Sequence, residues 1–243
     1  MKIGITGQNG FIGYHLTQTI KYKHSDFTIV PFQKSFFEDE GLLIEFVSTC
    51  NVIVHLAGVN RANTDQEVYD GNIEITNSLK KALVGARYQG QLLFASSTQE
   101  YGRSLYGKAK KESRQLLEAC VNDLGGTFTG LLIPNIFGPF CKPNYNSFIA
   151  TFSQYIINDV EPKIITENDV EILYVGNLVE VIISKIKNPS ETSQAIGYKK
   201  TIKVSQVLKQ IKSFQKIYVK KGDIPPLETA FDVQLFNTFR SYL

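Results

Sequence analysis

Three glycines near the beginning of the chain constrain its fold more than any other feature. Gly7, Gly10 and Gly13 follow a short apolar strand and open a helix with one apolar face. Gly7 allows a sharp turn from strand to helix, Gly10 lets a pyrophosphate approach the backbone, and Gly13 lets the helix lie close on the sheet. A strand, a glycine turn and a helix in this order are typical of a dinucleotide-binding α/β unit. The expected cofactor contacts in this segment are Gly7, Asn9, Gly10, Phe11, Ile12 and Gly13.

The rest of the first half of the chain alternates between strand and helix signals. Continuous apolar runs indicate buried parallel strands, and segments with a helical period separate them. This alternation predicts an α/β fold, a Rossmann-type doubly wound parallel sheet with helices on both faces. The expected strands are 3–6, 27–32, 52–56, 92–95 and 127–133, and the expected helices are 11–22, 38–49, 65–85 with a break near Gly71, and 106–122.

After Pro134 the pattern changes to shorter elements that are separated by prolines, asparagines and aromatic residues. We interpret residues 1–243 as a single domain, in which 1–133 form the dinucleotide-binding core and 134–243 mainly a small C-terminal substrate lobe. The helices expected in the lobe are 145–157, 177–186, 205–214 and 228–242.

Composition excludes several classes of partner. A net charge of +3, with dispersed lysines and arginines, argues against nucleic acid. No apolar run approaches the roughly 20 residues of a membrane span, so no membrane partner is expected. The three cysteines lack a metal-binding spacing, which predicts reduced thiols, no metal site and a cytoplasmic protein.

A tyrosine and a lysine form the first candidate for chemistry. Tyr106 and Lys110 lie four residues apart at the start of an expected helix, so their side chains share one face. The Lys110 ammonium can favour the phenolate of Tyr106 and lower its pKa. Ser96, Ser97 and Thr98 end the preceding strand at its carboxyl edge, where open α/β sheets bind ligands. A hydroxyl there can hydrogen-bond a substrate carbonyl, or it can only cap the strand.

Together these motifs resemble the extended, sugar-nucleotide-modifying branch of the short-chain dehydrogenase/reductase superfamily. Segments 54–58 and 134–139 match motifs of that branch, and so does Asn72. The branch has its catalytic hydroxyl four residues before a Tyr-Gly pair, which implies Ser97, with Thr98 as the neighbouring alternative. The residues implied in catalysis are Ser97, Tyr106 and Lys110, and those implied in further cofactor contacts are Leu56, Ala57, Gly58, Asn72, Tyr106, Lys110 and Pro134.

Segments 54–61, 141–147 and 149–152 carry a closer likeness, to the reductase domain of bacterial capsule and O-antigen enzymes. Those enzymes reduce a UDP-2-acetamido-2,6-dideoxy-hexos-4-ulose, and sugar-modifying members of the superfamily often form homodimers. They usually continue into a cupin domain, and for this chain that part is expected to be absent, encoded separately or left out of this sequence. The chain departs from the family pattern at Leu132 and at 176–177, which affects substrate contacts rather than hydride chemistry.

The segment 135–148 is expected to face the cofactor cleft and to bind a UDP-sugar. Its amides and hydroxyl suit uracil and the sugar, while Lys142 suits the diphosphate. The alternative is a polar loop that is packed by its own aromatic side chains. The expected substrate contacts are Asn60, Arg61, Thr98, Asn135, Lys142, Asn146 and Ser147.

The end of the second expected strand bears on the choice of cofactor. An acidic residue there would hold the ribose of NAD and repel a 2′-phosphate. Residues 28–33 contain no Asp or Glu, and Lys34 follows them. This pattern favours NADPH, unless Lys34 is only a solvated loop charge.

Three reactions compete within this branch. A 4,6-dehydratase needs an acid–base pair directly after the catalytic hydroxyl, and Thr98 and Gln99 occupy those positions. A 4-epimerase retains its cofactor tightly, whereas a preference for NADPH suits a reductase that exchanges it. The sequence therefore predicts a 4-ketoreductase, with a 4-epimerase or a non-catalytic NADP(H)-sensing protein as alternatives.

Overall fold

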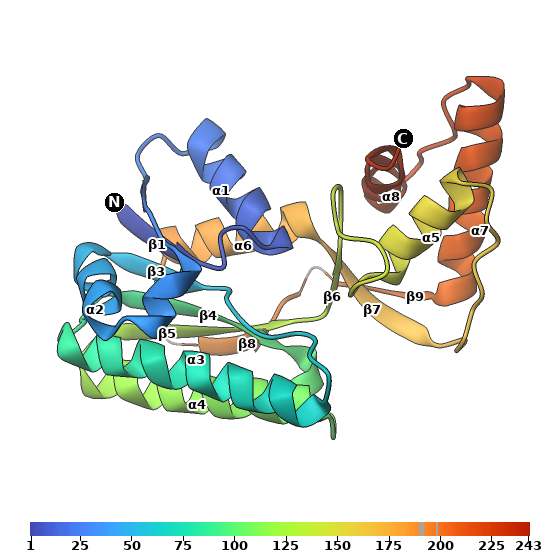
Figure 1. The fold of residues 1–243 in the computed structure, drawn as a ribbon. Helices are drawn as coiled ribbons and strands as arrows, with labels where there is room; N and C mark the ends of the chain where they lie inside the picture. Colours follow the sequence, from blue (N-terminus) through green and yellow to red (C-terminus); the bar gives the residue numbers. More distant parts are fainter. Residues whose placement is uncertain (190–191, 198) are drawn as a thin grey trace. The chain divides into compact units, whose positions relative to one another are not determined.

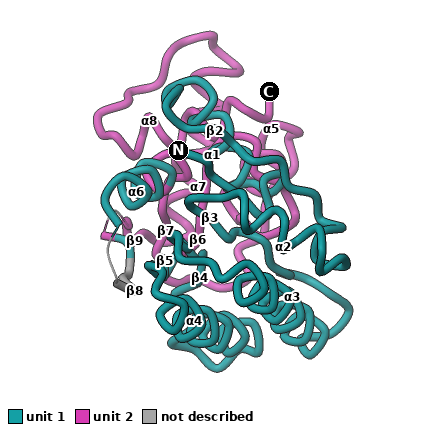
Figure 2. The backbone as a smooth tube through the Cα atoms, turned by 90° about the vertical axis from the view of Figure 1, so that its left-hand side faces the viewer, with its two compact units in different colours: residues 1–133, 179–196 teal, residues 134–178, 197–243 magenta. Residues whose placement is uncertain are grey.

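The computed structural model describes residues 1–189, 192–197 and 199–243. The chain divides into two compact units, which Figure 2 distinguishes by colour. Unit 1 comprises residues 1–133 and 179–196, and unit 2 comprises residues 134–178 and 197–243.

Unit 1 is built on a six-stranded sheet in which every pair of neighbouring strands is parallel. The strand order is β2-β1-β3-β4-β5-β8, so β1 lies between β2 and β3. The strands are β1 (Lys2–Thr6), β2 (Thr28–Val30), β3 (Val52–His55), β4 (Gln91–Ser97), β5 (Thr127–Ile133) and β8 (Thr192–Ala195). This arrangement confirms the predicted Rossmann-type α/β fold.

Helices cover both faces of this sheet (Figure 1). One face carries α2 (Glu40–Thr49), α3 (Asp65–Gly85) and α4 (Leu105–Asp123), whose apolar side chains share one buried cluster with β3, β4 and β5. The other face carries α1 (Phe11–Lys23) and α6 (Val175–Lys187). Two short 3-10 helices, η1 (Lys34–Glu38) and η2 (Thr98–Tyr101), follow β2 and β4.

The strand order places the glycine turn at a functional edge. The chain runs outward from β1 to β2 on one side and from β3 to β5 on the other, so the order reverses between β1 and β3. Ligands of open α/β sheets bind outside the carboxyl ends of the strands at such a reversal. The turn after β1 and the segment after β3 therefore lie where a ligand is expected.

Unit 2 has a smaller sheet in which β7 (Asp169–Tyr174) lies between β6 (Asn135–Phe137) and β9 (Lys200–Lys203). The pairing is parallel with β6 and antiparallel with β9. Apolar side chains of the sheet share a core with the helices of the unit. These helices are α5 (Phe148–Ile157), α7 (Val204–Phe214), the π-helical turn η3 (Gln215–Val219) and α8 (Ala230–Arg240).

The structure corrects the sequence prediction in three places. Helix α3 is continuous through Gly71, because a single glycine costs a helix only about 1 kcal/mol. The missing side chain leaves room for Val59, whose Cγ2 would lie 2.9 Å from an added Cβ. Strands β6 to β9 were not predicted, since each is at most six residues long and their pairing partners are distant in the sequence. Residues 179–196 belong with unit 1, whereas the sequence assigned them to the lobe.

The packing of β1 gives a test of the core of unit 1. A Cβ on Gly4 would lie 2.5 Å from both Cys50 Sγ and Phe46 Cζ. Gly4→Ala should therefore lower the free energy of unfolding by about 1–3 kcal/mol, the usual cost of overpacking a core. Urea unfolding measures this, with Gly41→Ala as the control, because a Cβ at Gly41 approaches nothing closer than 3.4 Å. Equal destabilisation of the two variants would contradict the tight packing at Gly4.

Candidate active site

In the glycine turn after β1, Gly10 and Gly13 both lie close to the carbonyl oxygen of Gly7. Gly7 has a φ of +76°, and its carbonyl oxygen accepts a hydrogen bond of 2.9 Å from the Gly10 N–H. A Cβ on Gly13 would lie 2.2 Å from the same oxygen. Gly13 is thus required for contact between helix and turn, whereas the sequence explained it by contact between helix and sheet.

The N-terminus of α1 is suited to a pyrophosphate. Gly10 is the N-cap residue, it offers no side-chain cap, and the first turn contains no acidic residue. The first backbone N–H groups of α1 thus lack a side-chain cap, and the helix dipole favours an anion there. Asn9 is exposed beside them, while Phe11 and Ile12 are half-buried.

Gln8 connects this turn to the segment after β2. Its Nε2 donates a hydrogen bond of 2.8 Å to the Phe32 carbonyl oxygen, two residues before Lys34. Lys34 is exposed and starts η1. This contact ties the glycine turn to the segment that leads to the predicted 2′-phosphate contact. Sequence reasoning did not identify Gln8, because a glutamine inside a glycine turn carries no signal of its partner.

The ends of β1 and β3 are joined through Thr6. Its carbonyl oxygen accepts from the Leu56 N–H at 3.1 Å, and its Oγ1 accepts from the Ala57 N–H at 3.3 Å. The buried His55 ring shares a 2.6 Å hydrogen bond with Thr6 Oγ1 through Nδ1. A Cβ on Gly7 would lie 2.8 Å from the Ala57 nitrogen. The glycine turn and the segment after β3 therefore form one compact edge.

Asn72 holds the continuation of this edge from α3. Its Nδ2 donates to the carbonyl oxygens of Val59 and Val68, both at 2.7 Å, and its Oδ1 accepts from the Val59 N–H at 3.2 Å. Its amide is buried and committed to backbone. Asn72 thus shapes the segment at Gly58, and any contact with a cofactor stays a prediction.

The strand end at Ser97 and the start of α4 fit closely together. Ser97 is buried, and its Oγ accepts from the Gln99 N–H at 3.2 Å, so it caps η2. A Cβ on Gly107 would lie 2.1 Å from the Gln99 carbonyl oxygen, so glycine permits α4 to pack against η2. This contact places the first turn of α4, which includes Tyr106, beside η2, which directly follows Ser97. Thr98, the alternative hydroxyl, is half-buried beside it.

Lys110 is buried on α4 within this arrangement. Its Nζ lies 4.5 Å from the centroid of the Phe94 ring and would lie 3.7 Å from a Cβ on Gly58. Burial lowers the pKa of Lys110 from its ordinary value of 10.5 to about 8, and the charge of Glu100 acts against this. The pKa of the neighbouring His55 falls to about 3, first through burial and then through the charge of Lys110, so His55 is neutral at physiological pH.

The pKa of Tyr106 in the chain alone differs from the expectation. Burial raises its pKa from 10.0 to about 12, and the charge of Lys110 is not among the causes. In the chain alone, withdrawal of the phenolate from water is therefore the effect that sets this pKa, and the lowering by Lys110 together with a nicotinamide charge stays a prediction. A protonated Tyr106 at neutral pH is suited to donate a proton.

The remaining predicted contacts are divided between the two units. Asn60 and Arg61 are exposed in unit 1, and Leu56 is half-buried there. In unit 2, Pro134 is buried and Asn135 is exposed, with its Nδ2 donating to the Glu171 carbonyl oxygen at 3.2 Å.

The loop before α5 carries the last three candidates. Lys142 and Asn146 are exposed, and the Lys142 ammonium lies 5.6 Å from the ring centroid of Tyr145. Ser147 is buried and its Oγ accepts from the Ala150 N–H at 3.4 Å. Ser147 is thus the N-cap of α5, and its contact with a substrate stays a prediction.

Comparison with known proteins identifies the family. The sequence matches the NAD dependent epimerase/dehydratase family over residues 3–198. The chain belongs to this family. The match confirms the superfamily expected from the sequence.

Within the described part of the chain, no helix has the length and apolar character needed to cross a membrane.

The chain is also similar to individual proteins of known sequence or structure. The chain is 30% identical to a UDP-2-acetamido-2,6-beta-L-arabino-hexul-4-ose reductase of Pseudomonas aeruginosa, over 100% of this chain and 65% of that protein. Capsular polysaccharide assembling protein CapF from Staphylococcus aureus matches with a TM-score of 0.82 and 26% identity, again over 100% of this chain and 65% of that one. RMD from Pseudomonas aeruginosa, complexed with NADPH, has the same fold at 15% identity, with a TM-score of 0.84 over 99% of this chain and 98% of that chain. The chain thus spans about two thirds of the first two relatives.

The buried ammonium of Lys110 predicts a gain of stability when it is removed. Its pKa of about 8 in the folded chain, against 10.5, means that burial of the charge costs about 3 kcal/mol at pH 7. Lys110→Met should therefore raise the free energy of unfolding at pH 7. Wild-type stability rises as the pH passes from 8 toward 10.5, because the folded chain binds fewer protons there, so the advantage of the variant should shrink.

Chemical unfolding at pH 7 and pH 9 measures this difference. Lys111→Met is the matched control, because Lys111 is the next residue on α4 and is exposed. A loss of stability in Lys110→Met at pH 7, or an advantage that grows with pH, would contradict the assignment of Lys110 as a buried, costly charge.

Proposed function

We propose that this chain catalyses the NADPH-dependent reduction of the C4 keto group of a UDP-linked 2-acetamido-2,6-dideoxy-hexos-4-ulose. The observation that carries this proposal is the packing of the first turn of α4, which bears Tyr106, against η2, which directly follows Ser97 at the carboxyl end of β4. The similarity to a UDP-hexulose reductase over the whole chain supports the substrate class. The likeness to CapF supports a role in surface-polysaccharide synthesis.

The residues of unit 1 fit a nicotinamide dinucleotide. The turn at Gly7 and the uncapped N-terminus of α1 would hold the pyrophosphate, and Lys34 would face the 2′-phosphate of NADPH. Leu56 to Gly58 and Lys110 would border the nicotinamide end, where Lys110 would hold the ribose. When bound, the reduced nicotinamide supplies the hydride that the sugar C4 receives.

The catalytic side chains would then act on the carbonyl oxygen. Tyr106, protonated at neutral pH, donates its phenolic proton to the C4 oxygen as negative charge develops there. Ser97 donates a hydrogen bond that orients the same oxygen. Lys110 adds a positive charge beside the reacting groups and stabilises the phenolate that Tyr106 becomes.

Reduction is favoured over the other reactions of the branch. Dehydration needs an acid–base pair after the catalytic hydroxyl, and Thr98 and Gln99 do not titrate in the useful range. The next carboxylate, Glu100, is buried and bonded to Arg114. A 4-epimerase remains the competing function, because the family includes epimerases. It would interconvert two sugars without net consumption of NADPH.

The substrate is proposed to bind through unit 2. Lys142 and Asn146 are exposed and offer a charge and an amide for the diphosphate and uracil. The further proposed contacts are Asn60, Arg61 and Thr98 in unit 1, and Asn135 and Ser147 in unit 2. We also propose that the chain forms a homodimer and acts in the cytoplasm.

Removal of the phenol tests the reaction. Tyr106→Phe should lower turnover by at least about a hundredfold, the usual scale of general acid catalysis, while NADPH binding is retained. The assay follows NADPH consumption with the UDP-4-keto sugar, and the matched control is Tyr101→Phe, since Tyr101 is exposed on η2. Turnover without net NADPH consumption would favour the epimerase, and near-normal turnover in Tyr106→Phe would remove Tyr106 from the acid role.

A charge reversal tests the choice of cofactor. Lys34→Glu should flatten or reverse the preference for NADPH over NADH, because a carboxylate repels the 2′-phosphate. The dissociation constants of both cofactors, measured by fluorescence titration, give the preference directly. Lys23→Glu, a change of the same charge at the far end of α1, is the control. Tighter binding of NADH by the unmodified chain would show that Lys34 has no such role.

A further inference from the structure

Glu100 is a buried carboxylate that the proposed reaction does not use. It lies on η2, three residues after Ser97, and only 8% of the residue is exposed. Its Oε1 accepts a hydrogen bond from Ser96 Oγ at the end of β4. Ser96 and Ser97 are adjacent in the strand, so their side chains point to opposite faces of the sheet. The hydrogen bond between Ser96 and Glu100 therefore fixes the backbone that also carries Ser97.

Arg114 holds the same carboxylate from α4. Its Nε donates to Glu100 Oε1 at 3.0 Å and its Nη2 to Oε2 at 3.0 Å, which is a two-pronged ion pair. Such pairs constrain geometry as well as charge. Tyr106, Lys110 and Arg114 follow at intervals of four along α4, so they lie along one side of the helix.

These contacts join the elements that carry the three proposed catalytic groups. Through Ser96 the carboxylate is bonded to β4, and through Arg114 it is bonded to α4. We propose that Glu100 is a positioning residue, which sets the strand end bearing Ser97 against the helix bearing Tyr106 and Lys110. This inference rests on the proposed function for its kinetic consequence, but not for its structural one.

The charge of Glu100 has a second consequence at Lys110. In the described part of the chain, the Lys110 ammonium lies over the Phe94 ring of β4 and beside Gly58, which follows β3, and its charge acts on the neutral His55 of β3. Tyr106 lies one turn earlier on the same helix. Glu100 is the negative charge that acts on Lys110. Loss of that charge should favour deprotonation of Lys110.

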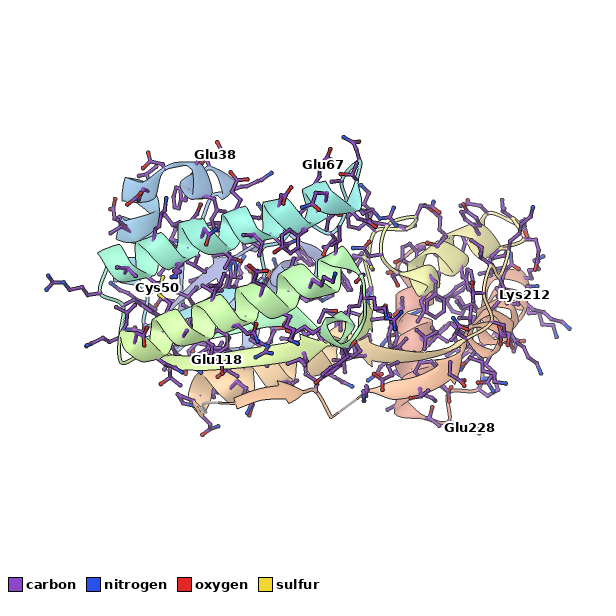
Figure 3. The ribbon with its side chains drawn as sticks, turned by 90° about the horizontal axis from the view of Figure 1, so that it is seen from below. Glu38, Cys50, Glu67, Glu118, Lys212 and Glu228 are labelled. Carbon is purple, nitrogen blue, oxygen red and sulfur yellow. The ribbon has the colours of Figure 1, made fainter. Side chains whose placement is uncertain are left out.

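Two variants separate Glu100 from the rest of the ion-pair cluster. Glu100→Gln keeps the shape of the side chain and removes its charge. The control is Glu118→Gln, because Glu118, labelled on α4 in Figure 3, binds the same Arg114 at 3.2 Å and is more exposed. If Glu100→Gln fails to fold, the double variant Glu100→Gln/Arg114→Met is used in its place. The double variant removes both partners of the buried ion pair and so leaves neither charge unpaired.

The experiment measures the titration of Lys110 and the kinetics in the full chain. Lysine side chains labelled with carbon-13 report the pKa by NMR, and the missing signal of Lys110→Met assigns Lys110. In Glu100→Gln the pKa of Lys110 should fall by about one pH unit, and in the double variant by less, because the Arg114 cation is removed as well. The value of kcat should fall about tenfold, with KM for NADPH changed less than about twofold. Glu118→Gln should leave both unchanged.

The outcomes distinguish this inference from the proposed function. Absence of NADPH consumption by the unmodified chain would overturn the proposed reaction, while the Lys110 titration would still decide the effect of Glu100. An unchanged kcat in Glu100→Gln would overturn the positioning role, and an unchanged Lys110 titration would overturn the effect of the Glu100 charge on Lys110. Equal effects of Glu100→Gln and Glu118→Gln would also overturn it, because the contact with Ser96 would then be irrelevant.

Discussion

The close approach of two backbones at the edge of the sheet underlies the rest of the site. The glycine turn after β1 comes so near the segment after β3 that a Cβ on Gly7 would lie 2.8 Å from the Ala57 nitrogen. Thr6 bonds to this segment, and Asn72 clamps its continuation at Val59. The ammonium of Lys110 lies beside Gly58 in the same segment. Displacement of either backbone would therefore move both the glycine turn after β1 and the segment that lies beside Lys110 of α4.

Burial sets the charges of this site. Withdrawal from water keeps His55 neutral, Tyr106 protonated and Lys110 close to losing its proton. The buried Glu100 carboxylate is paired with the Arg114 guanidinium, which donates hydrogen bonds to both of its oxygens. Buried charges of this kind are costly, so their presence at one edge of the sheet is typical of a functional site rather than a stabilising core. The chemistry proposed for this family member depends on that environment as much as on the residue types.

Much of unit 1 was predictable from the sequence, because each signal there is local. The glycines at positions 7, 10 and 13 follow a strand directly, and the buried strands of the sheet are continuous apolar runs. Tyr106 and Lys110 share a helix face through their spacing alone, and Ser97 ends a strand. Unit 2 was less predictable, since its strands are short and β7 pairs with β9 across many intervening residues. The role of Ser147 as an N-cap was not predicted, because it depends on where α5 begins.

The sequence by itself therefore determined the class of fold, the family and the residue types that carry the candidate chemistry. Only the tertiary structure decided what surrounds them. The pKa of Tyr106 is raised because its ring is buried, which no spacing reveals. The link from Ser96 through Glu100 to Arg114 depends on how η2 packs against α4, and a Gly107 contact with Gln99 permits that packing. Helix and strand periods encode local geometry, whereas burial and ion pairing depend on residues that meet only after the chain has folded.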